Sequence, residues 1–140
     1  NVCQTYMQAA EIFDFELSIA TPAGYEPSEA FSQKYKKNIN FFNNPMQACQ
    51  EADVVVTDVW TSMGQESEKK QRESSFKGFQ VDQLMMNQAK ADAVFMHCLP
   101  AYRGIEVSSE VIDGSQSVVW SEAENRLHAQ KSLLLYLIED

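Results

Sequence analysis

The sequence predicts an α/β domain built on a doubly wound, mostly parallel sheet with helices on both faces. Three observations predict this class. Short apolar runs alternate about five times with segments of helical periodicity, as in sheets whose strands are joined by crossover helices. The run DVVVTD at 53–58 is apolar on both faces, which is typical of a central parallel strand. The 140 residues, 44% hydrophobic and 22% charged, suit one globular domain.

The first four elements follow from local patterns. Residues 2–15 carry apolar side chains at helical spacing and predict an amphipathic helix. Residues 16–21 alternate like a short strand, which ends at the turn-rich segment TPAGYEP. The composition of 28–38 predicts a second helix, and INFF at 39–42 predicts the second strand.

The middle of the chain predicts one strand and three helices. In NNPMQACQEA, Asn44 is a good helix N-cap and Pro45 a good first helical residue. The β-branched run at 53–58 is expected to form the third strand. Residues 66–76 predict a polar helix, and residues 82–89 predict another short one.

The last part of the chain predicts two strands and a long helix. AVFMH at 93–97 and SVVW at 117–120 are expected to be the fourth and fifth strands, and 123–140 a helix with a Leu/Ile stripe. In such sheets ligands bind beyond the carboxyl ends of the strands. The segments of functional interest are therefore DVWTSMG (58–64), HCLPAYRG (97–104) and SEAENR (121–126).

Composition excludes several classes of partner. A net charge of -9 argues against a nucleic-acid partner, which usually needs a basic face. No apolar run approaches about 18 residues, so no membrane span is expected. The three cysteines are odd in number and widely spaced, which indicates a reducing compartment, and Cys3 and Cys49 are interpreted as core residues. Two histidines and no Cys-x-x-Cys predict no zinc site.

Two groups of residues after the third strand have two interpretations each. Asp58 is either a turn or N-cap carboxylate, or a carboxylate that faces the crevice and holds a cation. Ser62, Met63 and Gly64 form either a simple turn or a loop whose backbone amides approach a ligand carboxylate.

The HCLP segment raises the same choice. His97 and Cys98 are either packing residues or part of the chemistry. Pro100 either fixes a bend that holds nearby carbonyls in place or is a plain loop proline. Arg103 and Arg126 are the cations nearest the expected crevice, and Arg126 is placed to hold a fork of donors over the strand ends. A carboxylate, a thiol and an arginine in one crevice suggest a small, zwitterionic or anionic substrate, without identifying a reaction.

Three segments carry a family resemblance. DVWTSMGQE, FMHCLPAYRGIEV and SEAENRLHAQKSLL resemble the signature segments of the ornithine carbamoyltransferase family, in its C-terminal, ornithine-binding domain. NVCQTYMQAA and ATPAGYEP match the opening of that domain, so the resemblance covers essentially the whole chain. In the related aspartate carbamoyltransferases a proline replaces the cysteine and the Ser-Met-Gly loop is absent.

The resemblance implies an enzyme and its reaction. The family transfers a carbamoyl group from carbamoyl phosphate to the δ-amine of L-ornithine, a step of arginine biosynthesis. The products are L-citrulline and phosphate, and no metal or organic cofactor takes part. A cytoplasmic homotrimer, or a multiple of trimers, is implied, whose partners are the two small-molecule substrates.

The resemblance also assigns roles to residues. The ornithine α-amino and α-carboxylate ligands that it implies are Asn1, Asp58, Ser62 and Met63. Cys98 is expected to face the δ-amine, and the backbone around Cys98 and Leu99 to contact the carbamoyl group of carbamoyl phosphate. Arg126 is expected to reach the carbamoyl oxygen, where attack builds negative charge.

Residues 1–140 are expected to be one half of a two-domain carbamoyltransferase. The N-terminal carbamoyl-phosphate domain, with its Ser-x-Arg-Thr-Arg loop, and the first strand of this domain are expected upstream, so the 140 residues alone are expected to be inactive. Alternative acceptors within the superfamily are acetylornithine, succinylornithine and putrescine, and Ser-Met-Gly favours free ornithine. A non-catalytic ornithine-binding module is the alternative from another class.

Overall fold

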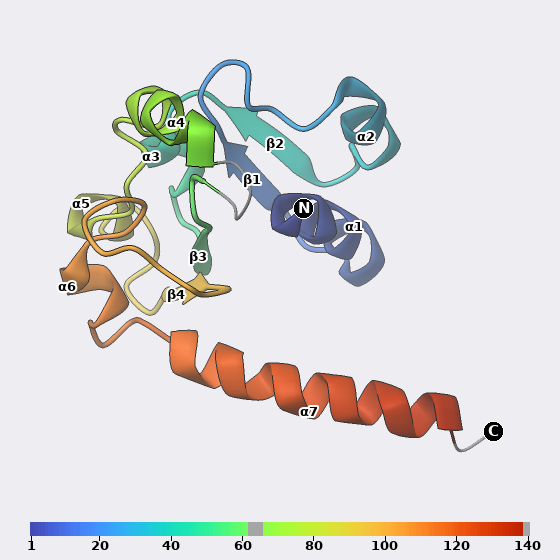
Figure 1. Cartoon of the computed structure of the whole chain (residues 1–140). Helices are drawn as coiled ribbons and strands as arrows, with labels where there is room; N and C mark the ends of the chain where they lie inside the picture. Colours follow the sequence, from blue (N-terminus) through green and yellow to red (C-terminus); the bar gives the residue numbers. More distant parts are fainter. Residues whose placement is uncertain (62–65, 139–140) are drawn as a thin grey trace.

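The computed structural model describes residues 1–61 and 66–138 (Figure 1). In the first half, the elements are α1 (Val2–Phe13), β1 (Leu17–Ala20), α2 (Glu29–Lys34), β2 (Ile39–Phe42), α3 (Pro45–Ala48) and β3 (Val54–Thr57). In the second half, they are the 3-10 turn η1 (Glu66–Glu68), α4 (Lys69–Ser75), α5 (Gln83–Met86), β4 (Val94–His97), α6 (Ser109–Ile112) and α7 (Val119–Ile138). Strands alternate with helices and pair in parallel, so the predicted α/β class is confirmed.

Two parallel strand pairs form the β structure of the described residues. β1 pairs with β2, with Leu17 opposite Ile39, and β3 pairs with β4, with Thr57 opposite His97. Helix α1 packs against β1, α3 against β1 and β2, and the start of α7 against β4. Because β3 and β4 are parallel and in register, the loops that follow Thr57 and His97 leave the same edge side by side.

The fifth predicted strand, at 117–120, is wrong. Ser117 forms a single parallel bridge with Phe95, and Val118 N–H donates to Phe95 O at 3.0 Å. Helix α7 then begins at Val119, and Glu122 N–H donates to Val118 O at 2.9 Å. The β-branched valines favour a strand locally, but the backbone bonds of the first helical turn use the groups that a strand would need. The long helix therefore starts earlier than predicted, directly beside β4.

Helices α3 and α6 begin directly after a capping residue, and α2 ends earlier than predicted. The cap at Asn44 is confirmed, since its Oδ1 accepts from Met46 N–H at 3.0 Å. Helix α2 stops short of Asn38, which has φ 84° and whose Nδ2 donates to Asp14 Oδ1 at 3.0 Å. Helix α6 was not predicted, although Ser108 caps it by accepting from Val111 N–H.

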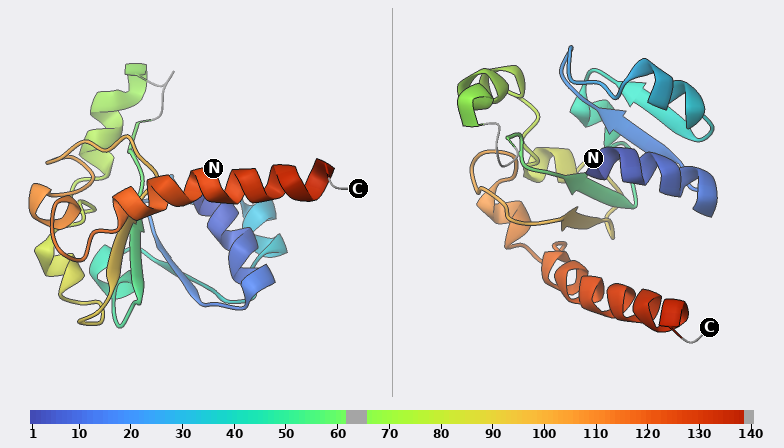
Figure 2. Two further views of the ribbon diagram at one scale, coloured as in Figure 1. Left: turned by 90° about the horizontal axis from the view of Figure 1, so that it is seen from below. Right: turned by 45° about the vertical axis from the view of Figure 1, so that its right-hand side comes forward.

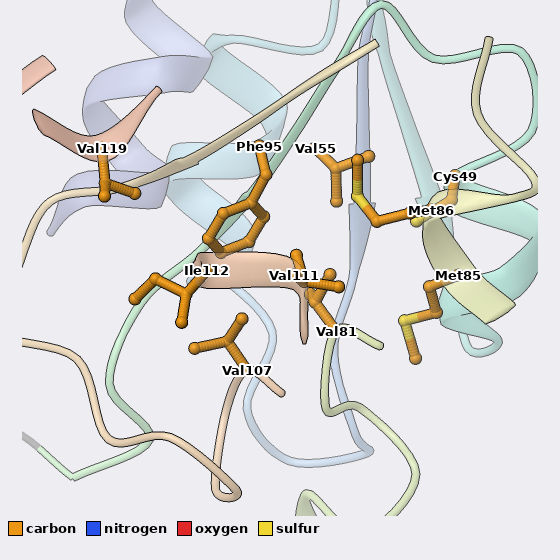
Figure 3. Close-up of a cluster of buried hydrophobic side chains, with 10 residues drawn as sticks. All are labelled: Cys49, Val55, Val81, Met85, Met86, Phe95, Val107, Val111, Ile112 and Val119. Atoms are coloured by element: carbon orange, nitrogen blue, oxygen red, sulfur yellow. The ribbon is translucent and has the colours of Figure 1, made fainter. Parts of the chain in front are cut away.

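A single apolar cluster under β3 and β4 forms the main core (Figure 3). Its members come from both strands, the helices around them and the segments that join these elements: Cys49, Val55, Val81, Met85, Met86, Phe95, Val107, Val111, Ile112 and Val119. Cys49 is thus a core residue as predicted, but Cys3 is exposed, in the first turn of α1 and one turn before the buried Met7 on the same helix face. Both faces of β3 were expected to be buried. Val55 is buried as expected, whereas Val54, on the other face, is 45% exposed.

Most of α7 extends away from the strands (Figures 1 and 2). Only its first residue, Val119, is buried, and apolar side chains along the rest of the helix are exposed. The large ones are Trp120, Leu127, Leu133, Leu134, Leu135, Tyr136, Leu137 and Ile138. None of the helices within 1–61 and 66–138 combines the length and the apolar character that crossing a membrane requires.

Candidate active site

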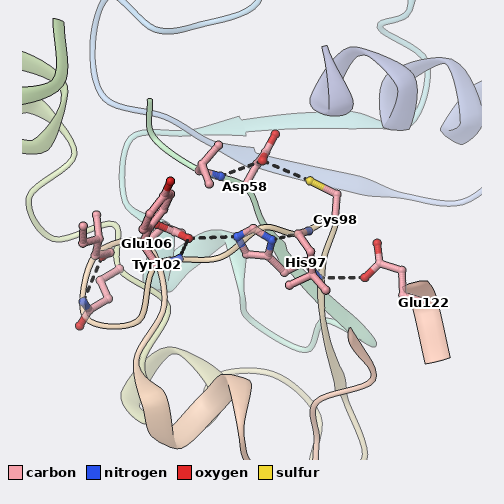
Figure 4. Close-up of polar contacts among 10 residues, drawn as sticks. Asp58, His97, Cys98, Tyr102, Glu106 and Glu122 are labelled. Carbon is pink, nitrogen blue, oxygen red and sulfur yellow. Dashed lines mark hydrogen bonds and ion pairs between the residues drawn. The ribbon is translucent and has the colours of Figure 1, made fainter. Parts of the chain in front are cut away.

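Asp58 and Cys98 are brought together by the register of two strands. Thr57 is paired with His97, so the next residue on each strand lies at the same edge. The Cys98 thiol donates to Asp58 Oδ1 at an Sγ–Oδ1 distance of 3.2 Å (Figure 4). The same oxygen accepts from Val59 N–H at 2.7 Å. This local bond holds the carboxylate in a position that faces Cys98.

The thiol of Cys98 is held in its neutral form. Burial, followed by the hydrogen bond and charge of Asp58, raises the pKa of Cys98 from 9.0 to about 11. At neutral pH the side chain is therefore a thiol that donates a hydrogen bond, and neither a thiolate nucleophile nor a general base.

His97 is a buried hydrogen-bonding centre (Figure 4). Its backbone N–H donates to Glu122 Oε2 on α7 at 2.9 Å. Its ring uses both nitrogens: Nδ1 accepts from Leu99 N–H at 2.9 Å, and Nε2 lies 3.2 Å from Glu106 Oε1. The ring is 1% exposed, so it supports the loop from beneath and does not face the crevice.

The loop after β4 has a fixed backbone. Leu99 adopts φ 53°, a left-handed conformation that costs a residue with a Cβ about 1–2 kcal/mol, and the Leu99–Pro100 peptide bond is cis. Tyr102 N–H donates to Glu106 Oε1 at 2.6 Å, and Gly104 N–H donates to Val107 O at 2.8 Å. These bonds make the backbone of HCLPAYRG a closed turn.

Arg103 is held at the surface by a carboxylate. Its Nε and Nη2 donate to the two oxygens of Asp113 at 2.9 and 2.7 Å. This two-point ion pair uses the in-plane N–H donors along one edge of the guanidinium. Of the two cations that the sequence places near the crevice, Arg103 is therefore already occupied.

The structure places two of the four remaining predicted site residues, Asn1 and Arg126. Asn1 caps α1, with its Oδ1 accepting from Val2 N–H at 2.6 Å. Ser62 and Met63 lie outside the described residues. Arg126 is exposed on α7, and between 1–61 and 66–138 no hydrogen bond or ion pair joins it to Cys98. It stands four residues after Glu122 on the same face of the helix, about 6 Å further along the axis.

Helix α1 also borders the site through Tyr6. Burial first, and then the nearby Glu122 carboxylate and Cys98, raise the pKa of the Tyr6 hydroxyl. Tyr6 lies on the helix that Asn1 caps. Tyr6 therefore lies close enough to Glu122 and Cys98 for their charges to act on its hydroxyl.

Sequence reasoning missed Glu106 and Glu122. Glu106 is fully buried, and its only sequence signal is an acid between two apolar residues, Ile105 and Val107. Glu122 stands in the first turn of α7, where an acid is also expected for helix stability alone. Both contact the segment 97–102, which the sequence did identify.

The arrangement suits a polar organic substrate. A half-buried carboxylate and a neutral thiol share one strand edge, where a cationic or amino group finds the free acceptor positions of the carboxylate and the weak acceptor of the sulfur. Among the described residues, no three His, Cys, Asp or Glu side chains are grouped to hold a metal ion.

The chain is similar to known carbamoyltransferases. Residues 1–137 match the family model described as aspartate/ornithine carbamoyltransferase, Asp/Orn binding domain. The ornithine carbamoyltransferase of Ruthia magnifica subsp. Calyptogena magnifica is 60% identical over 138 residues, 99% of this chain and 46% of that protein. The one of Nitrosococcus oceani is 59% identical, over 99% of this chain and 45% of its own length.

A solved structure agrees in fold. The ornithine carbamoyltransferase of Burkholderia thailandensis E264 superimposes with a TM-score of 0.85 at 46% sequence identity, over 96% of this chain and 43% of that one. The chain thus spans about half the length of the relatives that it matches.

Proposed function

Since the chain belongs to the aspartate/ornithine carbamoyltransferase family, we propose that its protein transfers the carbamoyl group of carbamoyl phosphate to the δ-amine of L-ornithine. Residues 1–140 would be the ornithine-binding half of that enzyme, and the carbamoyl-phosphate half would lie elsewhere in the protein. The observation that carries the proposal is the pairing of Asp58 with the Cys98 thiol at one strand edge. It supports the two signature loops acting as one amine-binding site.

The proposed reaction replaces one bond of the carbamoyl carbon by another. The neutral δ-nitrogen attacks this carbon, a carbon–nitrogen bond forms, and the carbon–oxygen bond to phosphate breaks. The products are L-citrulline and phosphate, and the proton lost by nitrogen leaves with phosphate or solvent. No oxidant, reductant or metal is needed for this balance.

Cys98 and Asp58 would bind the acceptor amine. Because the pKa of Cys98 is raised to about 11, its thiol cannot remove the proton from nitrogen at neutral pH. Its proposed role is to fix the direction of the δ-amine, with Asp58 attracting the cationic form as it arrives. Asn1, Asp58, Ser62 and Met63 would hold the amino-acid head of ornithine.

Leu99 and Arg126 would act on the carbamoyl group of carbamoyl phosphate. The fixed backbone around Cys98 and Leu99 supports a contact to this group that needs no rearrangement. Arg126 would donate to the carbamoyl oxygen as negative charge develops there, which stabilises the transition state more than the ground state. Its position one turn beyond Glu122, whose carboxylate bonds to His97, supports this reach.

Assembly and location are further parts of the proposal. A homotrimer, or a multiple of trimers, rests on the family resemblance. A cytoplasmic location is supported by Cys3, Cys49 and Cys98, which are all free thiols.

The experiment is a product assay on the full-length protein. Carbamoyl phosphate is offered with L-ornithine, N-acetylornithine, N-succinylornithine or putrescine, and ureido product is measured. We expect the highest kcat/KM with L-ornithine. A preference for another acceptor would overturn the substrate, and saturable ornithine binding without any product would favour the non-catalytic module.

A further inference from the structure

A buried carboxylate beneath the active-site loop has no role in the proposed chemistry. Glu106 is 0% exposed and is reached by no solvent. Burying a carboxylate costs stability unless hydrogen bonds compensate it. Glu106 Oε1 accepts twice, from His97 Nε2 at 3.2 Å and from Tyr102 N–H at 2.6 Å, whereas Oε2 has no partner among the residues that the structure describes.

The two bonds of Oε1 join both ends of the loop. His97 is the last residue of β4, and Tyr102 lies five residues later. The other ring nitrogen of His97 accepts from Leu99 N–H, in the middle of the same loop. One carboxylate oxygen and one imidazole therefore hold two backbone amides of the loop that contains Cys98, those of Leu99 and Tyr102.

The hydrogen bonds define where the imidazole carries its proton. Leu99 N–H donates to Nδ1, so Nδ1 is unprotonated and the ring proton is on Nε2, directed at Glu106. A ring whose two nitrogens are both engaged has no free site to take a proton from the Cys98 thiol. This geometry is that of a fixed support and not of a proton relay.

We propose that His97 and Glu106 are positioning residues that hold Leu99 in its left-handed conformation for carbamoyl transfer. The inference rests on the proposed function. Without the bond to Nδ1, Leu99 loses the contact that offsets its unfavourable φ of 53°, and the loop relaxes. The Cys98 side chain and the backbone of Leu99 would then leave the geometry that the two substrates require.

The first test compares two substitutions of Glu106 in the full-length protein. Glu106→Gln keeps an oxygen at Oε1 and changes only the oxygen without a described partner, so kcat should stay within about threefold. Glu106→Met keeps the length and removes the acceptor, so kcat should fall by about tenfold or more, measured below the melting temperature. Glu110→Met, at an exposed position on α6, is the matched control and should leave kcat unchanged.

A second measurement does not depend on activity. Hydrogen–deuterium exchange of the peptide that carries Leu99 and Tyr102 should be faster in Glu106→Met, and unchanged in Glu106→Gln and in the control. A kcat in Glu106→Gln as low as in Glu106→Met would overturn the proposal, because the charge would then matter and not the position. Wild-type exchange and kinetics in Glu106→Met would overturn it as well.

His97 provides the same test should Glu106→Met fail to fold. His97→Asn places an amide oxygen where Nδ1 lies, whereas His97→Leu keeps the volume without an acceptor. We expect slower exchange at Leu99 in the Asn variant, and equal exchange in both would contradict the proposal. If the wild-type protein forms no citrulline, the proposed function fails, but the exchange measurements still decide whether the pair holds the loop.

Discussion

Across the ends of β3 and β4, the Cys98 sulfur lies 3.2 Å from Oδ1 of Asp58, and burial together with this carboxylate raises the pKa of the thiol, which keeps it protonated. The hydrogen bond is possible only because the two strands end in register, with Thr57 opposite His97. An acid that donates to a fixed carboxylate is harder to ionise, since the resulting thiolate would repel the neighbouring charge. This relationship makes the ionisation of Cys98 a direct measure of the site geometry.

Asp58→Asn should lower the pKa of Cys98. Burial remains and keeps it above 9.0, but the hydrogen bond to a charged acceptor and the like-charge repulsion are lost. Because the thiolate is the reactive form, alkylation at a given pH below the midpoint should become faster. The measurement is the rate of alkylation by iodoacetamide against pH, read at the Cys98 peptide in a Cys3→Ser background.

Asp53→Asn is the control for this titration. Asp53 is an exposed carboxylate at the start of β3 that pairs with Lys90, and its loss should leave the Cys98 midpoint near 11. A midpoint in Asp58→Asn equal to that of wild type would show that the thiol does not donate to this carboxylate.

Glu122 is expected to anchor α7 to the end of β4. Its Oε2 accepts the backbone N–H of His97 at 2.9 Å, and Ala at this position leaves a part-buried donor without a partner. We expect Glu122→Ala to lose roughly 1–3 kcal/mol of unfolding free energy, and Glu122→Gln to lose less because an acceptor remains. Melting temperatures of the full-length variants check this.

Glu124→Ala is the control that separates the loss of the bond between Glu122 and the His97 N–H from the general effect of removing an acidic side chain. Glu124 is exposed in the same turn and lies 3.8 Å from His128. Such a surface pair contributes little, so the control should melt within about 0.5 kcal/mol of wild type. Equal losses of unfolding free energy in Glu122→Ala and Glu124→Ala would mean that the bond from Glu122 to His97 adds nothing to stability beyond the general effect of the acid.

Arg126→Ala should lower kcat by about 10²–10³-fold in the full-length enzyme. This is the loss expected when one donor to a developing oxyanion is removed. Lys131→Ala removes the same charge from the same helix and is expected to leave kcat unchanged. A kcat of Arg126→Ala within about threefold of wild type would make Arg126 an ordinary surface residue of α7.

The sequence predicted the parts of this site that local patterns determine, and it missed the parts that depend on contacts made only in the folded chain. The strand ends at Asp58 and Cys98 were predictable, because apolar runs fix where β3 and β4 stop, and parallel strands present their carboxyl ends at one edge. The strand at 117–120 was not, because helix formation overrode the preference of two valines. Glu106 escaped for a different reason. Its partners, His97 and Tyr102, lie nine and four residues away, and only a folded loop brings them together.

The predicted role of Arg126 depends on contacts to a substrate. Its residue type and its place near the start of α7 predict a role, but the atoms that it would contact belong to a substrate. Ser62 and Met63 lie outside the described residues, so their predicted contacts to ornithine stay predictions. The roles of these residues are therefore tested by kinetic measurements. Substitution of Cys98 is the change that is expected to affect the two substrates most differently.

Cys98→Ala should weaken ornithine binding and slow turnover while leaving the affinity for carbamoyl phosphate nearly intact. Alanine keeps the backbone of the loop, and the bond from Leu99 N–H to His97 Nδ1 does not involve the Cys98 side chain. The proposed main-chain contacts to the carbamoyl group should survive for that reason. Ornithine, in contrast, loses a polar contact at its reacting nitrogen, so its KM should rise and kcat should fall.

A cysteine that only fills space would behave differently. Its removal would lower the melting temperature and leave the kinetics of both substrates unchanged. Steady-state kinetics for ornithine and for carbamoyl phosphate, measured with the melting temperature on one full-length variant, distinguish the two cases. Unchanged KM and kcat for ornithine would remove Cys98 from the amine site. Asp58 would then hold the thiol only as a structural partner, and the edge shared by β3 and β4 would be a corner of the fold.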